Sequence, residues 1–258
     1  MADVVVPRAY LDNFTQTVHE LDELGRQYLA DALEQTDLNN RSRVAAIMRV
    51  HCNASAEAAG ELAAQFYRGM SMMQTGEDFD GMSLPGFTND ELDDATYAIY
   101  AASGDEEEIL RRLLNEHSYV VNRSAKHSVW ANGQIDPRDV RYARVPMGEK
   151  TCAWCISLAG LGFHFMTEES ASHTHEHCDC RIVPCIGEGS VSVEEYEPED
   201  YADVWRDAAR RLREGDVPQE LRDRIDRAKA QHASRTSEPW KPFNEQLIAM
   251  RYFNDLKS

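Results

Sequence analysis

The sequence predicts an α+β protein that is mainly α, with a long helical N-terminal region, a small metal-stapled core that contains β-strands, and a helical C-terminal region. Three observations support this prediction. Apolar residues recur at helical spacing through the first half of the chain. Short β-like runs bounded by glycine or proline follow Pro137, and helical spacing returns after an acidic stretch that ends at Asp200. With 258 residues, of which 42% are hydrophobic, the chain is long enough to bury a core.

Two long helices are expected first. One is predicted over residues 10–34, where apolar residues recur at intervals of three, four or seven, namely Leu11, Phe14, Val18, Leu21 and Tyr28. The next is expected to follow the capping residues of 37–40 and to end before Gly69. Its apolar residues are Val44, Ile47, Ala54, Ala58, Leu62 and Phe66.

Capping boxes predict the starts of a third and a fourth helix. Thr88 with Glu91 forms one, and Ser103 with Glu106 repeats the pattern. We expect the fourth helix to stop at Asn132-Gly133. Four helices with short polar connections indicate a bundle or an elongated arm over residues 1–136, which we interpret as a partner-docking region.

Residues 137–187 are expected to form a small β-containing core, whose strand-like runs are 142–146, 163–165 and 181–184. Residues 188–258 are expected to be an acidic linker followed by helices. The linker holds Glu188, Glu194, Glu195, Glu197, Glu199 and Asp200 without a lysine or arginine. Beyond it, basic and acidic residues are balanced and pair at i,i+4 spacing, as Asp207 does with Arg211, which predicts a solvated helix face rather than a DNA-binding stripe.

Four of the six cysteines are concentrated in two short motifs of the central region, Cys152-Ala-Trp-Cys155 and His175-Glu-His177-Cys178-Asp-Cys180. Two close thiolate pairs from separate segments can complete a tetrahedral site. We therefore expect a structural zinc ion whose ligands come from Cys152, Cys155, Cys178 and Cys180, with His175 or His177 able to replace either of the last two. His173 and His164 are weaker candidates.

Two further roles for these cysteines stay open on the sequence alone. Free cysteines are often small buried core residues. A disulfide framework is the main rival, but such frameworks belong to short secreted chains, and the N-terminus has neither the basic region nor the apolar run of a signal peptide. We therefore expect a protein made in the cytoplasm, with its thiols reduced and without a membrane-spanning segment.

Several enzyme classes can be compared with the same motifs. A zinc deaminase requires His-x-Glu before Pro-Cys-x-x-Cys, and a metalloprotease requires His-Glu-x-x-His, but neither motif is present. A thioredoxin-like oxidoreductase requires a strand and helix alternation that is not evident here. A zinc-stapled nuclease of the His-Asn-His type is the better alternative, since His173, His175 or His177 would be available for a catalytic metal. No convincing partner set follows Cys180, so we expect a protein that is not an enzyme.

The net charge of −18 argues against general nucleic-acid binding, because affinity for phosphates comes mainly from clustered lysine and arginine. Direct contact with DNA or RNA is therefore doubtful.

The motifs of residues 140–185 also carry a family resemblance. The run Arg144-Val-Pro146, the Cys152-Ala-Trp-Cys155-Ile-Ser-Leu-Ala-Gly-Leu-Gly-Phe163 segment and the His175-to-Pro184 segment resemble the core of the MuF-like minor head proteins of tailed phages, especially those that infect actinobacteria. An upstream helical region is similar to the family's usual layout.

This resemblance implies a minor capsid protein at the portal vertex inside the head, with the portal protein as its partner and the major capsid or scaffolding protein as further candidates. It implies a part in head morphogenesis and in DNA packaging or ejection. It also implies that Cys152, Cys155, His175, Cys178 and Cys180 are structural metal ligands. Some relatives carry a toxin or enzymatic domain after this core, whereas residues 191–258 contain no recognisable catalytic set, so we expect a head protein without an effector.

Overall fold

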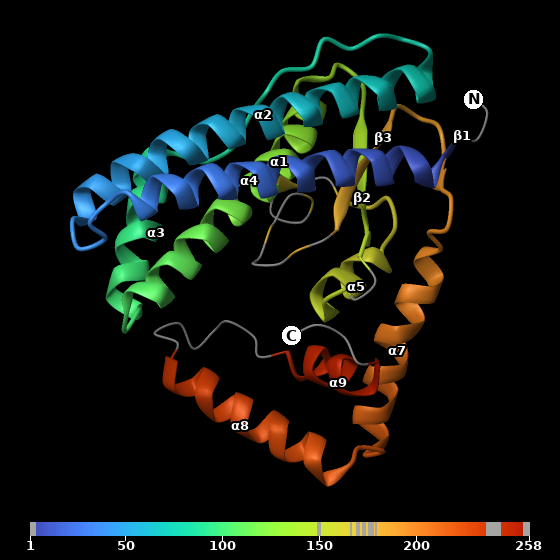
Figure 1. Cartoon of the computed structure of the whole chain (residues 1–258). Helices are drawn as coiled ribbons and strands as arrows, with labels where there is room; N and C mark the ends of the chain where they lie inside the picture. Colours follow the sequence, from blue (N-terminus) through green and yellow to red (C-terminus); the bar gives the residue numbers. More distant parts are fainter. Residues whose placement is uncertain are drawn as a thin grey trace.

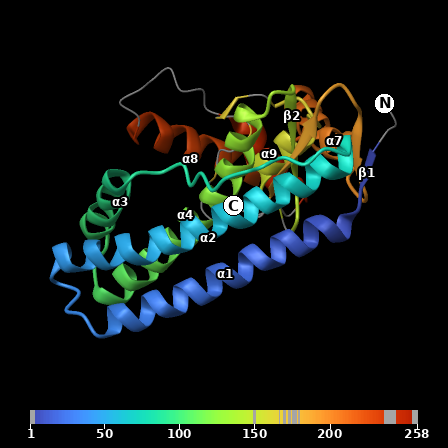
Figure 2. The same cartoon turned by 90° about the horizontal axis from the view of Figure 1, so that it is seen from above.

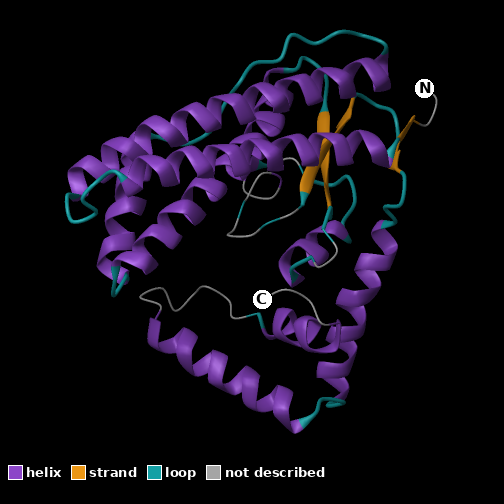
Figure 3. Ribbon diagram, in the orientation of Figure 1, coloured by secondary structure: helices purple, strands orange, loops and turns teal. Residues whose placement is uncertain are grey.

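The computed structural model describes residues 4–148, 151–165, 167–168, 171, 174, 178, 180–235 and 244–254. The described chain is mainly helical, as predicted, and it contains two small sheets (Figures 1 and 3). Its elements in chain order are β1 (Val4–Val6), α1 (Arg8–Glu34), α2 (Arg41–Thr75), α3 (Asn89–Ala102), α4 (Glu106–Ile135), β2 (Val140–Val145), α5 (Ala153–Ala159), β3 (Arg181–Ile186), β4 (Val191–Val193), α7 (Pro198–Glu214), α8 (Gln219–Arg235) and α9 (Glu245–Asn254).

The three longest helices, α1, α2 and α4, pack side by side and form the body of the molecule (Figure 2). Helix α2 begins as expected, because the side chain of Asn40 accepts a hydrogen bond from the Arg43 N–H. The prediction that α2 ends before Gly69 is wrong, since the helix continues to Thr75. It stops at Gly76, whose left-handed φ of 74° suits glycine. The extra turns bury Met70 in the core, while Met72 stays half-exposed.

The predicted start of α3 is confirmed, because Thr88 and Glu91 form both hydrogen bonds of a capping box. The second predicted box is wrong. Asp105, rather than Ser103, caps α4 by accepting from the Glu108 N–H, while the Ser103 hydroxyl donates back to Ile99 inside α3. Both residues can accept such a bond, and the structure selects the one directly before the helix.

The predicted stop of α4 at Asn132-Gly133 is also wrong, since the helix runs to Ile135. Both residues are buried and make tertiary contacts there. The Asn132 amide donates to Met82 O, and the Met82 N–H donates to Asn132 Oδ1. Gly133 leaves room for the Tyr142 hydroxyl, which a Cβ at this position would meet. These contacts compensate for the poor helix propensity of the pair.

Strands β2 and β3 form an antiparallel pair, with Val140 opposite Ile186 and Val145 opposite Arg181. The expected strand at 163–165 is a single bridge from Phe165 to Tyr142, so the predicted three-run sheet has two strands. Helices α2 and α4 pack on β3. Gln74 of α2 joins the layers, because its amide donates to Pro184 O and accepts from the Ile186 N–H.

A second pair joins the start of the chain to the acidic stretch, where β1 runs parallel to β4. One apolar core combines residues of α1, α2, α4 and the β2–β3 sheet. Helices α7, α8 and α9 form a separate apolar cluster with α5, in the lower part of Figure 1. The helices predicted after the acidic stretch are therefore present, and Asp207 pairs with Arg211 at 2.8 Å as expected. The three-part division at residues 136 and 187 stays a prediction.

Candidate metal centre

Four cysteines from two segments of the chain meet between α4, α5 and β3. Cys152 directly precedes α5, Cys155 lies in its first turn, and Cys178 and Cys180 lie just before β3. All four are buried, at most 6% exposed, and form one contact cluster. The Sγ atom of Cys155 lies 3.5 Å from that of Cys178 and 3.4 Å from that of Cys180, and the latter two are 3.2 Å apart.

The start of α5 holds the first cysteine pair in place. Cys152 occupies the N-cap position, and its sulfur accepts a hydrogen bond from the Cys155 N–H at 3.3 Å. An N-terminal helical turn presents free N–H groups, which stabilise a negatively charged sulfur. The local fold of the Cys-x-x-Cys motif therefore suits thiolates as well as thiols.

Two buried cations point at the second cysteine pair. Lys126 of α4 donates from Nζ to Cys178 Sγ at 2.7 Å, and Arg144 of β2 donates from an Nη atom to Cys180 Sγ at 2.9 Å. Lys126 is 1% exposed and Arg144 is fully buried. The other Nη of Arg144 donates to the carbonyl of Ala171 at 3.0 Å. Both cations are thus held in fixed positions beside sulfur.

The electrostatics of the cluster are dominated by these close contacts. Burial acts to lower the pKa of Arg144, but the attraction of Cys180, Cys178 and Cys155 outweighs it, so the pKa of this guanidinium is raised. Hydrogen bonding among the sulfurs, with Cys152 first, together with burial raises the pKa of the Cys155 thiol well above its ordinary range. These contacts therefore favour the protonated form of Cys155.

The donor set suits a soft divalent metal. The sulfurs of Cys155, Cys178 and Cys180 all lie within 4.8 Å of one another, and Cys152 joins the group through Cys155. The edges of a tetrahedron with metal–sulfur bonds of about 2.3 Å would be about 3.8 Å long, close to the observed separations. None of the six cysteines is in a disulfide. These cysteines are able to bind a metal ion.

The structure brings together the four cysteines that the sequence singled out. The predicted ligand His175 and the alternatives His173 and His177 lie outside the described residues. His164 is exposed, and it does not belong to the group of metal-capable side chains found among the described residues.

Sequence reasoning missed Lys126 and Arg144 as part of the site. Arg144 stood out only as part of the Arg144-Val-Pro146 run. Lys126 gave no clear signal either, because it lies one position after Ala125 and so falls outside the apolar spacing of Val121, Ala125 and Val129 on α4.

Comparison with known proteins supplies a family for this architecture. The model of the VG15 protein family matches residues 5–208, from β1 through the cysteine cluster and most of α7. The chain belongs to the VG15 family. Its members are phage or viral gene products, so this is a viral protein. No curated protein and no solved structure matches the chain.

A second buried polar cluster lies between the long helices, where His117 of α4 bridges α1 and α2. Its Nδ1 lies 3.0 Å from Asp22 Oδ1, and its Nε2 lies 2.9 Å from Ser55 Oγ. This order of side chains is that of a serine hydrolase triad. Ser55, however, lies within α2 and is 7% exposed, with Gly25 packed against the same hydroxyl. We interpret this cluster as a polar tie between the three long helices.

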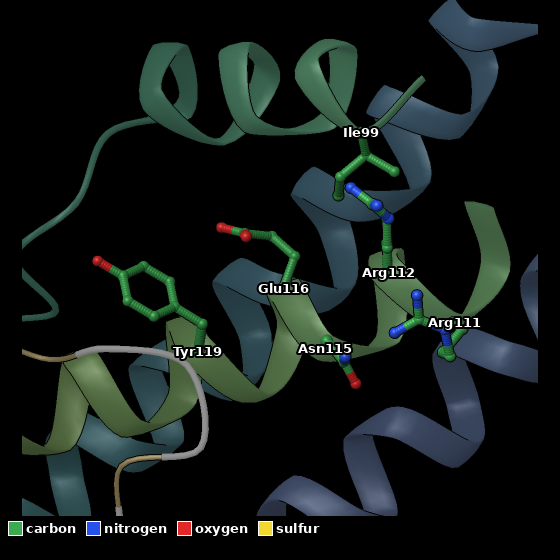
Figure 4. Close-up of a pocket in the computed structure, with 6 residues that line it drawn as sticks. All are labelled: Ile99, Arg111, Arg112, Asn115, Glu116 and Tyr119. Atoms are coloured by element: carbon green, nitrogen blue, oxygen red, sulfur yellow. The ribbon is translucent and has the colours of Figure 1, made fainter. Parts of the chain in front are cut away.

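A surface hollow of about 450 Å³ lies between α3 and α4, away from the cysteines (Figure 4). Its lining residues are Ile99, Arg111, Arg112, Asn115, Glu116 and Tyr119. None of these six lining residues is a cysteine, a serine or a histidine. Among the described residues of the VG15 chain, no helix is long and apolar enough to cross a membrane.

Proposed function

We propose that this protein is a minor capsid protein of a tailed phage, which binds the portal vertex inside the head and acts in head morphogenesis. The observation that carries the proposal is the family match, because it joins the helical region and the cysteine cluster in one viral family over residues 5–208. The likeness of residues 140–185 to MuF-like minor head proteins supports this specific role. We also propose a part in DNA packaging or ejection, since a protein at the portal vertex would lie beside the path of the DNA.

The metal centre fits a structural role in such a protein. Catalytic zinc sites keep an open position for water or substrate, whereas structural sites are closed. Here the four cysteines are nearly inaccessible, and their neighbours come from α4, β2, α5 and the segment before β3. We propose that a zinc ion fastens the small sheet and α5 to the long helices, so that the helical region has a rigid base.

The portal protein is the proposed partner, with the major capsid or scaffolding protein as further candidates. Long helices with exposed polar faces, such as α1 and α2, offer an extended surface for protein contacts. The net charge of −18 favours a protein partner over packaged DNA. We propose no catalytic activity for this chain.

The test is co-expression with the portal protein of the same phage, followed by affinity purification of the portal and native mass spectrometry. We expect the protein to co-purify with portal rings in a defined ratio. Recovery of only free protein would contradict the proposal. A nuclease assay on DNA tests the His-Asn-His alternative. That alternative predicts DNA cleavage that His175→Ala or His177→Ala abolishes, whereas we expect no cleavage by the wild-type protein.

A further inference from the structure

Lys126 and Arg144 carry information about the metal ligands themselves. This inference rests on the metal centre proposed above but not on binding to the portal. Both cations contact the same cysteine pair: Lys126 donates to Cys178, and Arg144 donates to Cys180 at 2.9 Å and more weakly to Cys178 at 3.7 Å. Both side chains are at most 1% exposed, so water does not screen their charges.

A buried charge is costly unless an opposite charge lies beside it. Two buried cations in one place therefore call for two negative charges in the same place. A divalent metal and its four thiolate ligands together carry two net negative charges. The positive charges of Lys126 and Arg144 would neutralise them. With three thiolates and one neutral histidine the excess is a single negative charge, which matches one of these cations rather than both.

We propose that Lys126 and Arg144 are positioning residues of an all-cysteine metal centre, and that their charges select Cys152, Cys155, Cys178 and Cys180 as ligands over any set containing His175 or His177. The two cations reach the sulfurs from different elements, α4 and β2. Charge compensation thus also joins the long helices to the sheet. The hydrogen bond from Arg144 to Ala171 O fixes the guanidinium, so Arg144 acts as an oriented donor as well as a charge.

The chain offers a matched control for Arg144. Arg141, on the same strand β2, contacts the sulfur of Cys185 at 3.5 Å, and Cys185 lies outside the four-cysteine cluster. Removal of either arginine takes one cation from an arginine–cysteine contact on β2. Of the two, Arg144 is the one that faces the proposed centre.

The first experiment measures zinc affinity of the full chain by competition with a chromogenic chelator under reducing conditions. We expect Lys126→Met and Arg144→Met each to weaken zinc binding about 10- to 100-fold, as loss of groups that support metal ligands commonly does. Lys126→Arg should restore most of the affinity because it keeps the charge, and Arg141→Met should leave the affinity unchanged. Equal affinity in wild type, Lys126→Met and Arg144→Met would overturn the proposal.

A second measurement separates charge compensation from ordinary packing. Without metal the doubly negative metal–thiolate unit is absent, so Lys126→Met should lower the melting temperature of the zinc-bound protein more than that of the metal-free protein. A packing role predicts equal changes in both forms, and that result would overturn the assignment. Lys126→Gln, which keeps an N–H donor without the charge, provides the same comparison with a polar side chain.

The ligand set is tested by cobalt(II) substitution, because sulfur-to-cobalt charge-transfer absorption grows with the number of thiolates. We expect His175→Ala and His177→Ala to retain both the wild-type spectrum and the metal content, and Cys152→Ser to reduce the absorption. A weaker effect of Cys152→Ser than of His175→Ala would overturn the four-cysteine set. Wild-type protein that binds neither zinc nor cobalt would overturn the metal centre itself, and the portal co-purification would still test the proposed function separately.

Discussion

The ammonium group of Lys126 lies 2.7 Å from the sulfur of Cys178, although the two residues are 52 positions apart and both are buried. A lysine in the core is rare unless an anionic partner accompanies it. This contact brings the third turn from the end of α4 to the segment before β3, so the helical region and the cysteine cluster share one charged contact. The metal centre and the long-helix packing are therefore expected to lose stability together.

The cysteine cluster predicts a large stability effect of metal loss. Cys155→Ser should abolish stoichiometric zinc binding and destabilise the protein by more than about 4 kcal/mol, or roughly 8–16 °C in melting temperature, because a structural metal contributes its binding energy to folding. Elemental mass spectrometry and differential scanning fluorimetry measure the two effects. Cys152→Ser should act in the same direction. Cys185→Ser is the control, since Cys185 is equally buried but lies outside the cluster, and it should keep the metal. Unchanged metal content in Cys155→Ser would refute the assignment.

The crowded surroundings of Gly25 predict that its replacement by alanine lowers the stability of the protein, although the same change inside a helix usually raises it. Glycine to alanine inside a helix normally stabilises by up to about 1 kcal/mol. Here a Cβ on Gly25 would lie 2.6 Å from the His117 ring and from Ser55 Oγ, so Gly25→Ala should destabilise by about 1–3 kcal/mol. Urea denaturation measures the change. Gly104→Ala, in the connection between α3 and α4, is the control for an uncrowded site, because its Cβ meets nothing closer than Glu108 Oε2 at 4.0 Å, and it should change the stability little. Stabilisation by Gly25→Ala would disprove the tight packing of the histidine.

Asp136 predicts a loss of stability in acid. Burial acts to raise the pKa of this carboxyl, but hydrogen bonds from Arg138 and Tyr67 outweigh it and leave the pKa lowered. Since the folded pKa lies below the unfolded value of about 3.9, the stabilisation is complete above that pH and disappears as the pH falls through the folded pKa. Asp136→Asn should therefore be less stable than wild type at pH 6, with the gap narrowing toward pH 3. Urea denaturation across this range measures it, and a gap independent of pH would contradict the network.

The start of α4 predicts unequal effects of two neighbouring residues. Asp105→Ala should cost about 1 kcal/mol because it leaves the Glu108 N–H without its cap and removes a negative charge from the helix N-terminus. Ser103→Ala should cost less, since its hydroxyl bonds only within α3. Guanidinium denaturation of the two variants measures the free energy of unfolding that each has lost. The reverse order would support the capping box that the sequence predicted.

Much of the helical architecture was determined by the sequence alone. The apolar stripe from Leu11 to Tyr28 predicted α1, and the Thr88–Glu91 pair predicted the start of α3, because these signals act within a few residues of the chain. The gathering of the four cysteines in one cluster was also predicted from the sequence, since two close cysteine pairs are short-range motifs. The ends of α2 and α4 were not found correctly. Gly69 and Asn132-Gly133 break helices by intrinsic propensity, and the contacts that compensate for it come from elements distant in the chain.

Tertiary structure alone decided which charged residues belong to the cysteine cluster and which polar residues join the long helices. Lys126 and Arg144 lie on separate elements before the cysteines, and His117 meets Asp22 and Ser55 only because α1, α2 and α4 pack together. A buried charge or hydrogen-bonding group is stable only beside a complementary group, and the partner is fixed by packing rather than by distance along the chain. Local periodicity therefore identified the helices and the thiols, whereas the charges around the thiols became visible only in the folded protein.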